Sequence, residues 1–492
     1  MPAPSCRLRI LSLDLRVLPM RTRFPFRYGI ASLTAVPHVF VQAEVEVDGE
    51  VVRGYTSEGL PPKWFTKNPR TTAAQDLADL IAVVQNAVRL APLVSKTPVT
   101  FHQLWQLLHK EQGQWGFKLA HPPLLWHFGV SMVERAALDA VCRKLELPLH
   151  QIVKSNALGV DWGRMHPGLD DHSASDFLPE APLETIHVRH TVGLVDPILV
   201  SDIAPEDRLH DGLPQALEEC IPAYGLRYFK IKVSGEVATD LPRLRTITGT
   251  LLAQCGDKFH VTLDGNENFA DITSFRTYFE KLQRDAPLKS LLERLLWVEQ
   301  PLHRDKALVD SVGQALLDWP QAPALIIDES DGTLGDAHKA LRLGYSGVSH
   351  KNCKGILKGL ANAALVHHHR RLRPKKNFIH SGEDLCIPGP VALMQDLAMH
   401  ALLGITHVER NGHHYFRGLT PYPAEIAEPT VRAHPDLYAT TIDGLTTLKI
   451  SLGDLSIKSV NEAPFGYGAE PNLSSLPTLK DWVAQGGIQT LA

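Results

Sequence analysis

The hydrophobic and polar positions of the chain form two different patterns, and the change between them falls near residue 186. Before it, the Val- and Leu-rich stretches 7–20 and 38–59 alternate in part, which predicts strands, and Asp48-Gly49 supplies a hairpin turn. Stretches 72–91 and 131–153 carry the spacing of amphipathic helices. We therefore expect an α+β domain over residues 1–150.

The segment 151–185 has no clear period and is rich in Gly, Pro, Asp and Ser. That composition is typical of turns and loops, so we interpret the segment as a linker or insertion.

From residue 186 onward, eight short apolar runs recur, each followed by a helical stretch, and most end in a charged tip. The successive tips are Lys232, Asp264, Glu299, Asp328, Lys351, His380 and Glu409. Their spacing matches the roughly 30 residues of a strand–helix unit, and eight such units close a barrel. The pattern predicts an α/β protein: a TIM-type (β/α) barrel over 186–420 that follows the N-terminal α+β domain. The segment 421–492 is expected to pack back on that domain and complete it.

Composition narrows the possible partners. The formal net charge is -4 and no long basic run occurs, which argues against nucleic acid or an anionic membrane surface as a partner. Charged residues such as Arg7 and Asp14 interrupt the N-terminus, so it is a poor signal peptide. No sufficiently long apolar stretch is evident, and the six cysteines form no C-x-x-C pair. We expect a cytoplasmic protein with reduced thiols.

Three acidic tips stand out. Asp264, Glu299 and Asp328 end consecutive predicted strands, and such ends converge at one rim of a barrel. Three converging carboxylates cannot all stay ionised without a cation, and oxygen ligands suit Mg²⁺. A single acid at such a point often only caps a helix, but three in register favour a metal site. Asn266 and Gln300 lie next to ligands and are expected to support them.

Lysines occupy two other tips. Lys230 and Lys232 are two residues apart on one run, so both point to the same side of the strand. They face either the barrel mouth or the outside, in which case Ile231 and Val233 would line the interior. Lys351 ends the sixth run and would lie across the barrel from Lys232. Two opposed amines suit proton removal from one side and delivery from the other.

The ordered motifs resemble those of the enolase superfamily. They are Lys-x-Lys (230–232), Asp-x-Asn (264–266), Glu-Gln-Pro (299–301), Asp-Glu-Ser (328–330) and Lys-x-x-Lys-Gly (351–355). Within that superfamily they are similar to mandelate racemase/muconate lactonizing enzymes, on the muconate-lactonizing branch. The N-terminal segment, including the helix that carries Glu134, looks like the capping domain of that family.

The resemblance implies an Mg²⁺-dependent isomerase or lyase that removes the α-proton of a carboxylate substrate and forms an enediolate. It implies racemase or epimerase, cycloisomerase or dehydratase activity, which the sequence does not separate. It also implies that Asp264, Glu299 and Asp328 ligate Mg²⁺. Lys232 and Lys351 would be the acid and base, with Lys230 tuning the site. We expect a small-molecule carboxylate as substrate, a homo-oligomer, and Glu329 as a further support beside the ligands.

The resemblance further assigns substrate selection to the loops 21–35 and 54–69, where Arg27 and Tyr28 are candidate contacts. Glu409 on the eighth strand is a further candidate contact, or a cap of the barrel. His380 stands on the seventh strand, where another branch keeps a basic histidine.

Two alternatives stay open: an acid-sugar dehydratase that uses His380, and a non-catalytic carboxylate-binding homologue. Two histidine groups, His367–His369 and the pair His413 and His414, resemble metal sites in outline, but their spacing favours solvated side chains.

Overall fold

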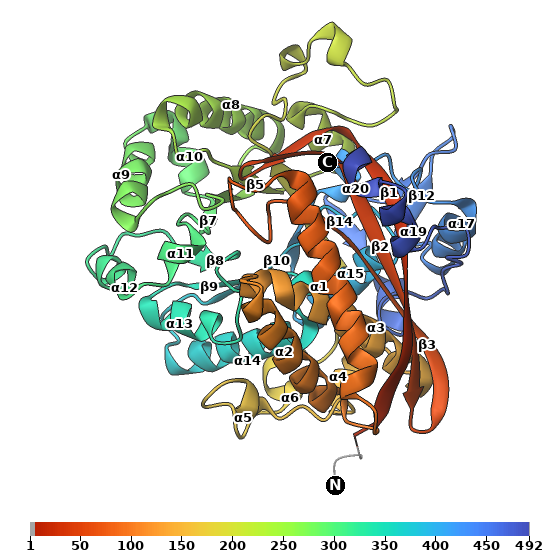
Figure 1. The fold of residues 1–492 in the computed structure, drawn as a ribbon. Coiled ribbons are helices and arrows are strands. Elements are labelled where there is room, and N and C mark those ends of the chain that lie inside the picture. Colours follow the sequence, from red (N-terminus) through yellow and green to blue (C-terminus); the bar gives the residue numbers. More distant parts are fainter. Residues whose placement is uncertain (1–4, 492) are drawn as a thin grey trace.

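The structure is a computed structural model that describes residues 5–491 (Figure 1). The N-terminal domain is an antiparallel sheet in the order β1-β2-β3 with three helices. Asp48 and Gly49 both have positive φ at the β2–β3 turn, as the hairpin prediction requires. The elements are β1 (Leu8–Tyr28), β2 (Ala31–Val47), β3 (Glu50–Gly59), α1 (Ala73–Val94), α2 (Phe101–Lys118) and α3 (Pro123–Leu145).

Helix α3 is the centre of this domain, because every residue from Leu124 to Cys142 is buried. It packs against β2, β3, α1 and α2. Within residues 5–491, α1 alone is long and apolar enough to cross a membrane by length and composition, a stretch that the sequence pattern did not indicate. Core helices pass the same test, and α1 packs on α2 and α3.

The segment expected to be a linker contains three short helices. They are α4 (Leu149–Lys154), α5 (Trp162–Met165) and α6 (Ala174–Phe177). They pack against the barrel helices α14 (Ile356–Leu372) and α15 (Ala392–Leu402). The segment therefore lies on the outer layer of the barrel.

Eight parallel strands form a closed barrel, because the last strand pairs with the first. The strands are β4 (Thr185–Val192), β5 (Tyr228–Lys232), β6 (His260–Asp264), β7 (Leu295–Glu299), β8 (Leu325–Ile327), β9 (Gly347–His350), β10 (Ile379–Gly382) and β11 (His407–Arg410). All eight coincide with the apolar runs of the sequence. The predicted fold class, a (β/α) barrel with an N-terminal α+β domain, is confirmed.

Helices cover the outside of the barrel (Figure 1). The main ones are α14, α15, α8 (Val237–Cys255), α9 (Ile272–Gln283), α12 (Asp310–Leu317) and α13 (Asp336–Leu343). Inside the barrel, Trp297, Ile326 and Ile379 form a small apolar cluster of their own. Ile231 and Val233 belong to the main hydrophobic core. Because side chains alternate along a strand, Lys230 and Lys232 then face the barrel interior.

The C-terminal segment contacts both domains. Strand β14 (Asp454–Ser456) pairs antiparallel with β4 at the barrel, and α18 (Lys458–Glu462) packs on α15. Helices α19 (Leu479–Ala484) and α20 (Gly487–Leu491) pack on β1, β2 and α1. The remaining elements are α17 (Ala424–Ala433) and the small hairpin β12 (Tyr438–Thr440) and β13 (Thr446–Leu448).

Glu134 of α3 joins the N-terminal domain to the barrel. Its carboxylate accepts hydrogen bonds from the backbone N–H groups of Ile356 (3.0 Å) and Leu357 (2.7 Å), the first residues of α14. A carboxylate at a helix N-terminus satisfies amides that have no partner within the helix. This contact fixes α3 close to the sixth strand, whose following residue is Lys351.

Candidate active site

Lys230 is the centre of a cluster of charges inside the barrel mouth. Its Nζ lies 2.8–3.0 Å from one carboxylate oxygen each of Asp264, Glu299, Glu383 and Glu409. Burial by itself lowers the pKa of Lys230, but these four carboxylates outweigh burial and hold that pKa well above its usual value. Lys230 is therefore a fixed positive charge that holds the acidic side chains together.

Lys232 lies one layer nearer the rim on the same strand. Its Nζ donates to Asp264 Oδ2 at 2.6 Å, and the other oxygen of Asp264 accepts from the backbone N–H of Asn266 at 2.8 Å. Burial raises the pKa of Asp264, but Lys230 and Lys232 outweigh it and lower that pKa to about 2. Asp264 is thus ionised at neutral pH.

Lys351 approaches from β9, the sixth strand, across the barrel from β5. Its Nζ donates to Asp328 Oδ2 (2.7 Å) and to Glu383 Oε2 (2.6 Å). Burial lowers the pKa of Lys351, but the two carboxylates outweigh burial and raise it well above its usual value. Nζ also lies 4.9 Å from the ring centroid of Trp64, so an aromatic face covers the amine.

Glu383 is a site residue that the motifs did not indicate. It follows β10 directly and bridges Lys230 and Lys351 through Oε2. Ile379 faces the barrel interior, so every second residue after it also does, which brings Ser381 and Glu383 inward. This two-residue phase was the available signal in the sequence.

The same phase turns His380 away from the site. Its ring lies 6.1 Å from that of His350, and burial together with His350 and Arg370 lowers its pKa well below the usual value. His380 therefore faces away from the barrel interior, and it does not line the pocket at the barrel mouth. The structure therefore does not bring the predicted seventh-strand histidine to the site; Glu383 occupies that strand end.

Three acidic groups come close enough to share a cation. One carboxylate oxygen each from Glu299, Asp328 and Glu383 lies within 4.8 Å of the others. Among the described residues, Glu299 Oε2 and Glu383 Oε1 are buried without a hydrogen-bond partner. Burial and the charge of Glu383 raise the pKa of Glu299 well above its usual value. Asp264, the other expected ligand, is not among these three acids; its Oδ2 lies 3.0 Å from Lys230 Nζ.

The residues expected to support the metal ligands form hydrogen bonds around these acids. Gln300 Oε1 accepts from the backbone N–H of Asp328 at 2.8 Å, and its amide donates to Ser330 at 2.7 Å. The Asn266 amide donates to Glu329 at 3.4 Å. Burial and the charge of Asp328 raise the pKa of Glu329 to about 8. Asn266 and Gln300 both have positive φ, which turns the chain sharply after β6 and β7.

The loop after β3 covers the mouth of the barrel. Arg304 fastens it, because its guanidinium donates to the carbonyl oxygens of Trp64 and Phe65, each at 2.9 Å. Glu267 holds Arg304 in turn, at 2.8 Å. Lys67 from the same loop donates to the Asn266 carbonyl. This loop, one of the two expected to select the substrate, thus contacts residues beside the predicted metal ligands.

A pocket lies between this loop and the lysines. Its apolar lining includes Phe26, Tyr28, Leu33, Pro61, Trp64 and Leu385. Tyr28 contributes its ring, while its hydroxyl donates to the Pro62 carbonyl at 2.8 Å. Arg27 is exposed and lines a different surface hollow, because alternation on β1 sends it to the other face. Of the two candidates on β1, the structure brings only Tyr28 to the pocket.

Glu409 lies in the pocket with its carboxylate fully engaged. It accepts from Lys230 (2.8 Å), from the Thr191 hydroxyl (2.5 Å) and from the Asn411 amide (3.0 Å). The neighbouring Arg410 pairs with Asp384 at 2.6 Å instead. Glu409, on the eighth strand, therefore helps to hold Lys230 in place.

The two histidine groups differ in exposure. His367 and His368 are half-buried and His369 is buried beside Phe378. His413 and His414 are both buried, so the expectation of solvated side chains is wrong for this pair. The reason is that α16 (Gly412–Tyr415) packs between the barrel wall and β1.

Comparisons with solved structures support the architecture. A mandelate racemase/muconate lactonizing protein from Herpetosiphon aurantiacus superposes with a TM-score of 0.58 at 16% identity, covering 96% of this chain and 99% of its own. An enolase from Bradyrhizobium complexed with magnesium and mandelic acid superposes with a TM-score of 0.54 at 14% identity. The match covers 97% of this chain and 98% of that enolase.

A muconate lactonizing enzyme from Pseudomonas fluorescens complexed with muconolactone gives a TM-score of 0.56 at 15% identity, with coverage of 97% and 98%. No protein-family model matches the sequence, and no curated protein matches it. At such low identity the structural likeness establishes the fold. The protein has the fold of the mandelate racemase/muconate lactonizing enzymes of the enolase superfamily, as its ordered motifs predicted.

Proposed function

We propose that this protein is an Mg²⁺-dependent enzyme that removes the proton α to the carboxylate of a small substrate and forms an enediolate. The observation that carries this proposal is the convergence of acidic side chains from consecutive strands with lysines from opposite sides of one barrel mouth. The reaction class is that of an isomerase or lyase: racemisation or epimerisation, cycloisomerisation or dehydration.

Asp264, Glu299 and Asp328 would hold the metal. The donor set fits Mg²⁺, because it consists of carboxylate oxygens and Glu299 Oε2 is buried without a partner in residues 5–491. The acids are also crowded enough that burial and Glu383 raise the pKa of Glu299. When bound, Mg²⁺ supplies positive charge that stabilises the substrate carboxylate and the enediolate and lowers the pKa of neighbouring lysines.

Lys232 and Lys351 would exchange protons with the α-carbon from opposite faces. Asp264 orients the amine of Lys232, while Asp328 and Glu383 orient that of Lys351. Lys230 remains protonated among its carboxylates and tunes the site by its charge. Trp64 covers the Lys351 amine and limits its contact with water.

The pocket lining favours a substrate with an apolar or aromatic body attached to its carboxylate. Rings of Phe26, Tyr28 and Trp64 and the side chain of Leu33 surround the space above the lysines. The polar groups in the pocket sit mainly on the barrel side, where the carboxylate would bind. This division is typical of sites that bury a ligand body and orient it through few polar contacts.

The proposal is tested by incubating the enzyme with Mg²⁺ and a panel of carboxylic acids in D₂O, and following α-proton loss by NMR. We expect exchange for acids with an apolar or aromatic body, and the product then separates racemase, cycloisomerase and dehydratase. The Lys232→Ala/Lys351→Ala double variant is the control and should show no exchange. Mg²⁺ binding without exchange of any acid would instead indicate a non-catalytic carboxylate-binding protein.

Dipeptides are expected to be poor substrates. A bound ammonium group needs paired charge or several acceptors, and on the eighth strand the carboxylate of Glu409 is already engaged by Lys230, Thr191 and Asn411. We therefore expect no useful epimerisation of dipeptides such as Ala-Glu in D₂O. Turnover at ordinary enzyme rates, around 10 per second, would contradict this assignment.

The cellular compartment and the oligomeric state of the protein are part of the same proposal. All six cysteines are free and buried, which fits a reducing compartment such as the cytoplasm. We also propose a homo-oligomer, which sedimentation measurements would test.

A further inference from the structure

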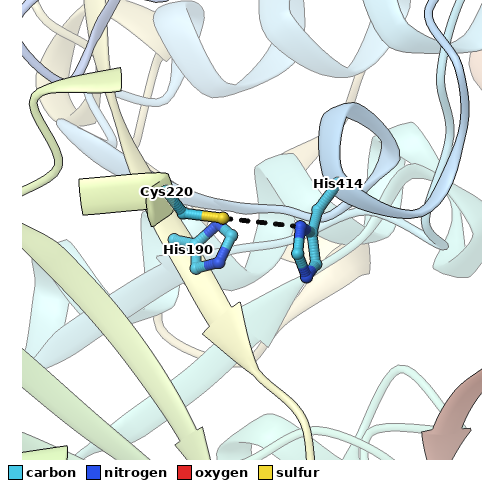
Figure 2. A group of neighbouring side chains, drawn as sticks. All are labelled: His190, Cys220 and His414. Atoms are coloured by element: carbon cyan, nitrogen blue, oxygen red, sulfur yellow. Dashed lines mark hydrogen bonds between the residues drawn. The ribbon is translucent and has the colours of Figure 1, made fainter. Parts of the chain in front are cut away.

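A second group of potential ligands lies outside the barrel wall, behind the active site. His190 comes from β4, Cys220 from α7 (Leu217–Tyr224) and His414 from α16, and their side chains point toward one another (Figure 2). One ligand atom from each lies within 4.8 Å of the others, and all three residues are buried. The segments are far apart in sequence, so only the fold brings them together.

The distances fit a metal of the zinc class. Cys220 Sγ lies 3.7 Å from His414 Nδ1. Bonds of about 2.3 Å to sulfur and 2.0–2.1 Å to nitrogen in a tetrahedral site place those two atoms about 3.6 Å apart. Thiolate and imidazole are ligands that zinc prefers, whereas Mg²⁺ prefers oxygen. The group therefore differs in chemistry from the carboxylate cluster.

The outer nitrogens of both imidazoles also face partners. His190 Nδ1 lies 3.2 Å from His413 Nε2, which leaves His190 Nε2 for a metal. His414 would ligate through Nδ1, and its Nε2 lies 4.0 Å from Asp196 Oδ2. In metal sites the second nitrogen of a ligating histidine commonly donates to a carboxylate, a backbone carbonyl or water. The contact with His413 would orient the His190 ring, while the Asp196 carboxylate lies near His414 beyond hydrogen-bond distance.

A hollow at the surface gives access to the group. Asp196 and Phe24 line a surface hollow, and the Phe24 ring lies 4.9 Å from that of His414. That hollow gives an ion an approach to the group.

We propose that His190, Cys220 and His414 bind a zinc ion through two imidazole nitrogens and one thiolate, with a fourth position left for water. The ion would tie β4 to α7 and α16, and α16 directly follows β11. Its expected role is structural: it would stabilise the pairing of the first and last barrel strands, close to Glu409. This inference does not depend on the proposed reaction.

The test measures zinc retained by the full-length protein. Protein loaded with zinc is dialysed against excess Mg²⁺, which competes for the carboxylate cluster, and its metal is counted by mass spectrometry. We expect about one zinc per chain, held by three protein ligands, in the parent and in Glu299→Gln, which alters the carboxylate cluster. Cys220→Ser and His414→Gln should lose it. Cys255→Ser, at another buried free cysteine, is the matched control and should retain it.

Cobalt substitution of the parent protein tests the ligands without any variant. A Cys–Co²⁺ site gives an intense near-ultraviolet thiolate charge-transfer band, and this band should appear with one equivalent of Co²⁺ in the presence of Mg²⁺. Circular dichroism checks that the variants are folded. Absence of that band, no retained zinc, or equal zinc in folded Cys220→Ser would overturn the proposal.

Discussion

Replacement of Lys351 by alanine is expected to lower turnover about 10²–10⁴-fold, the usual contribution of one proton-transfer group. The same loss is expected for Lys232→Ala. Each lysine faces the pocket from its own side of the barrel, so neither can take over the other's proton. Mg²⁺ binding should persist in both variants, because the carboxylates proposed as ligands remain.

The two variants should also differ from each other in deuterium exchange. For a racemase, each should still exchange the α-proton of one enantiomer, opposite for the two lysines. For a cycloisomerase or lyase, one variant should retain exchange and the other should lose it. Lys339→Ala, an exposed lysine of α13, is the control and should behave like the parent.

His380→Asn completes this series. It should remain active, because His380 lies beside His350 on the outer face of the strands and does not line the pocket. An inactive His380→Asn beside a fully active Lys351→Ala would overturn the two-lysine assignment.

Replacement of Asp328 by asparagine is expected to abolish activity and to weaken Mg²⁺ binding strongly. Asp328 belongs to the cluster of buried carboxylates and also pairs with Lys351 and Lys354, each at 2.7 Å. The substitution removes the negative charge of one proposed ligand. It also leaves two buried amines with less counter-charge, so we expect lower stability as well.

Calorimetric titration and thermal unfolding with and without Mg²⁺ would measure these effects. For the parent, Mg²⁺ at 100 times its Kd should stabilise the fold by about 2.7 kcal/mol, and chelation should abolish activity. Asp331→Asn is a matched control, because Asp331 is also buried and paired with a lysine, Lys358 at 3.1 Å, outside the pocket. Parent-like Mg²⁺ binding by Asp328→Asn would show that the ligand assignment is wrong.

The sequence by itself determined the barrel and most of its charged rim. A strand–helix repeat near 30 residues leaves few other folds, and the polar tip of each run marks the end of a strand. Asp264, Glu299 and Asp328 were found in this way, because each follows its apolar run directly. Lys230 and Lys232 could be placed on one face, since residues two apart on a strand share a side.

Where the sequence pattern is ambiguous, only the tertiary structure decided which side chains of a strand face the site and which face away from it. On the seventh strand both His380 and Glu383 are polar, and contact of Ile379 with Trp297 inside the barrel selects Glu383. On β1, pairing with β2 turns Tyr28 to the pocket and leaves Arg27 exposed. A shift of one residue reverses the face of every side chain, so packing must choose between the alternatives.

Contacts between distant segments also lay beyond the sequence. Nothing in the local pattern relates His190 and Cys220 to His414, because these residues belong to three separate elements. Their approach depends on how α7 and α16 pack outside the strand pair β4–β11. Periodicity reports which face of one element is apolar, whereas a site built from several elements depends on how those faces pack together.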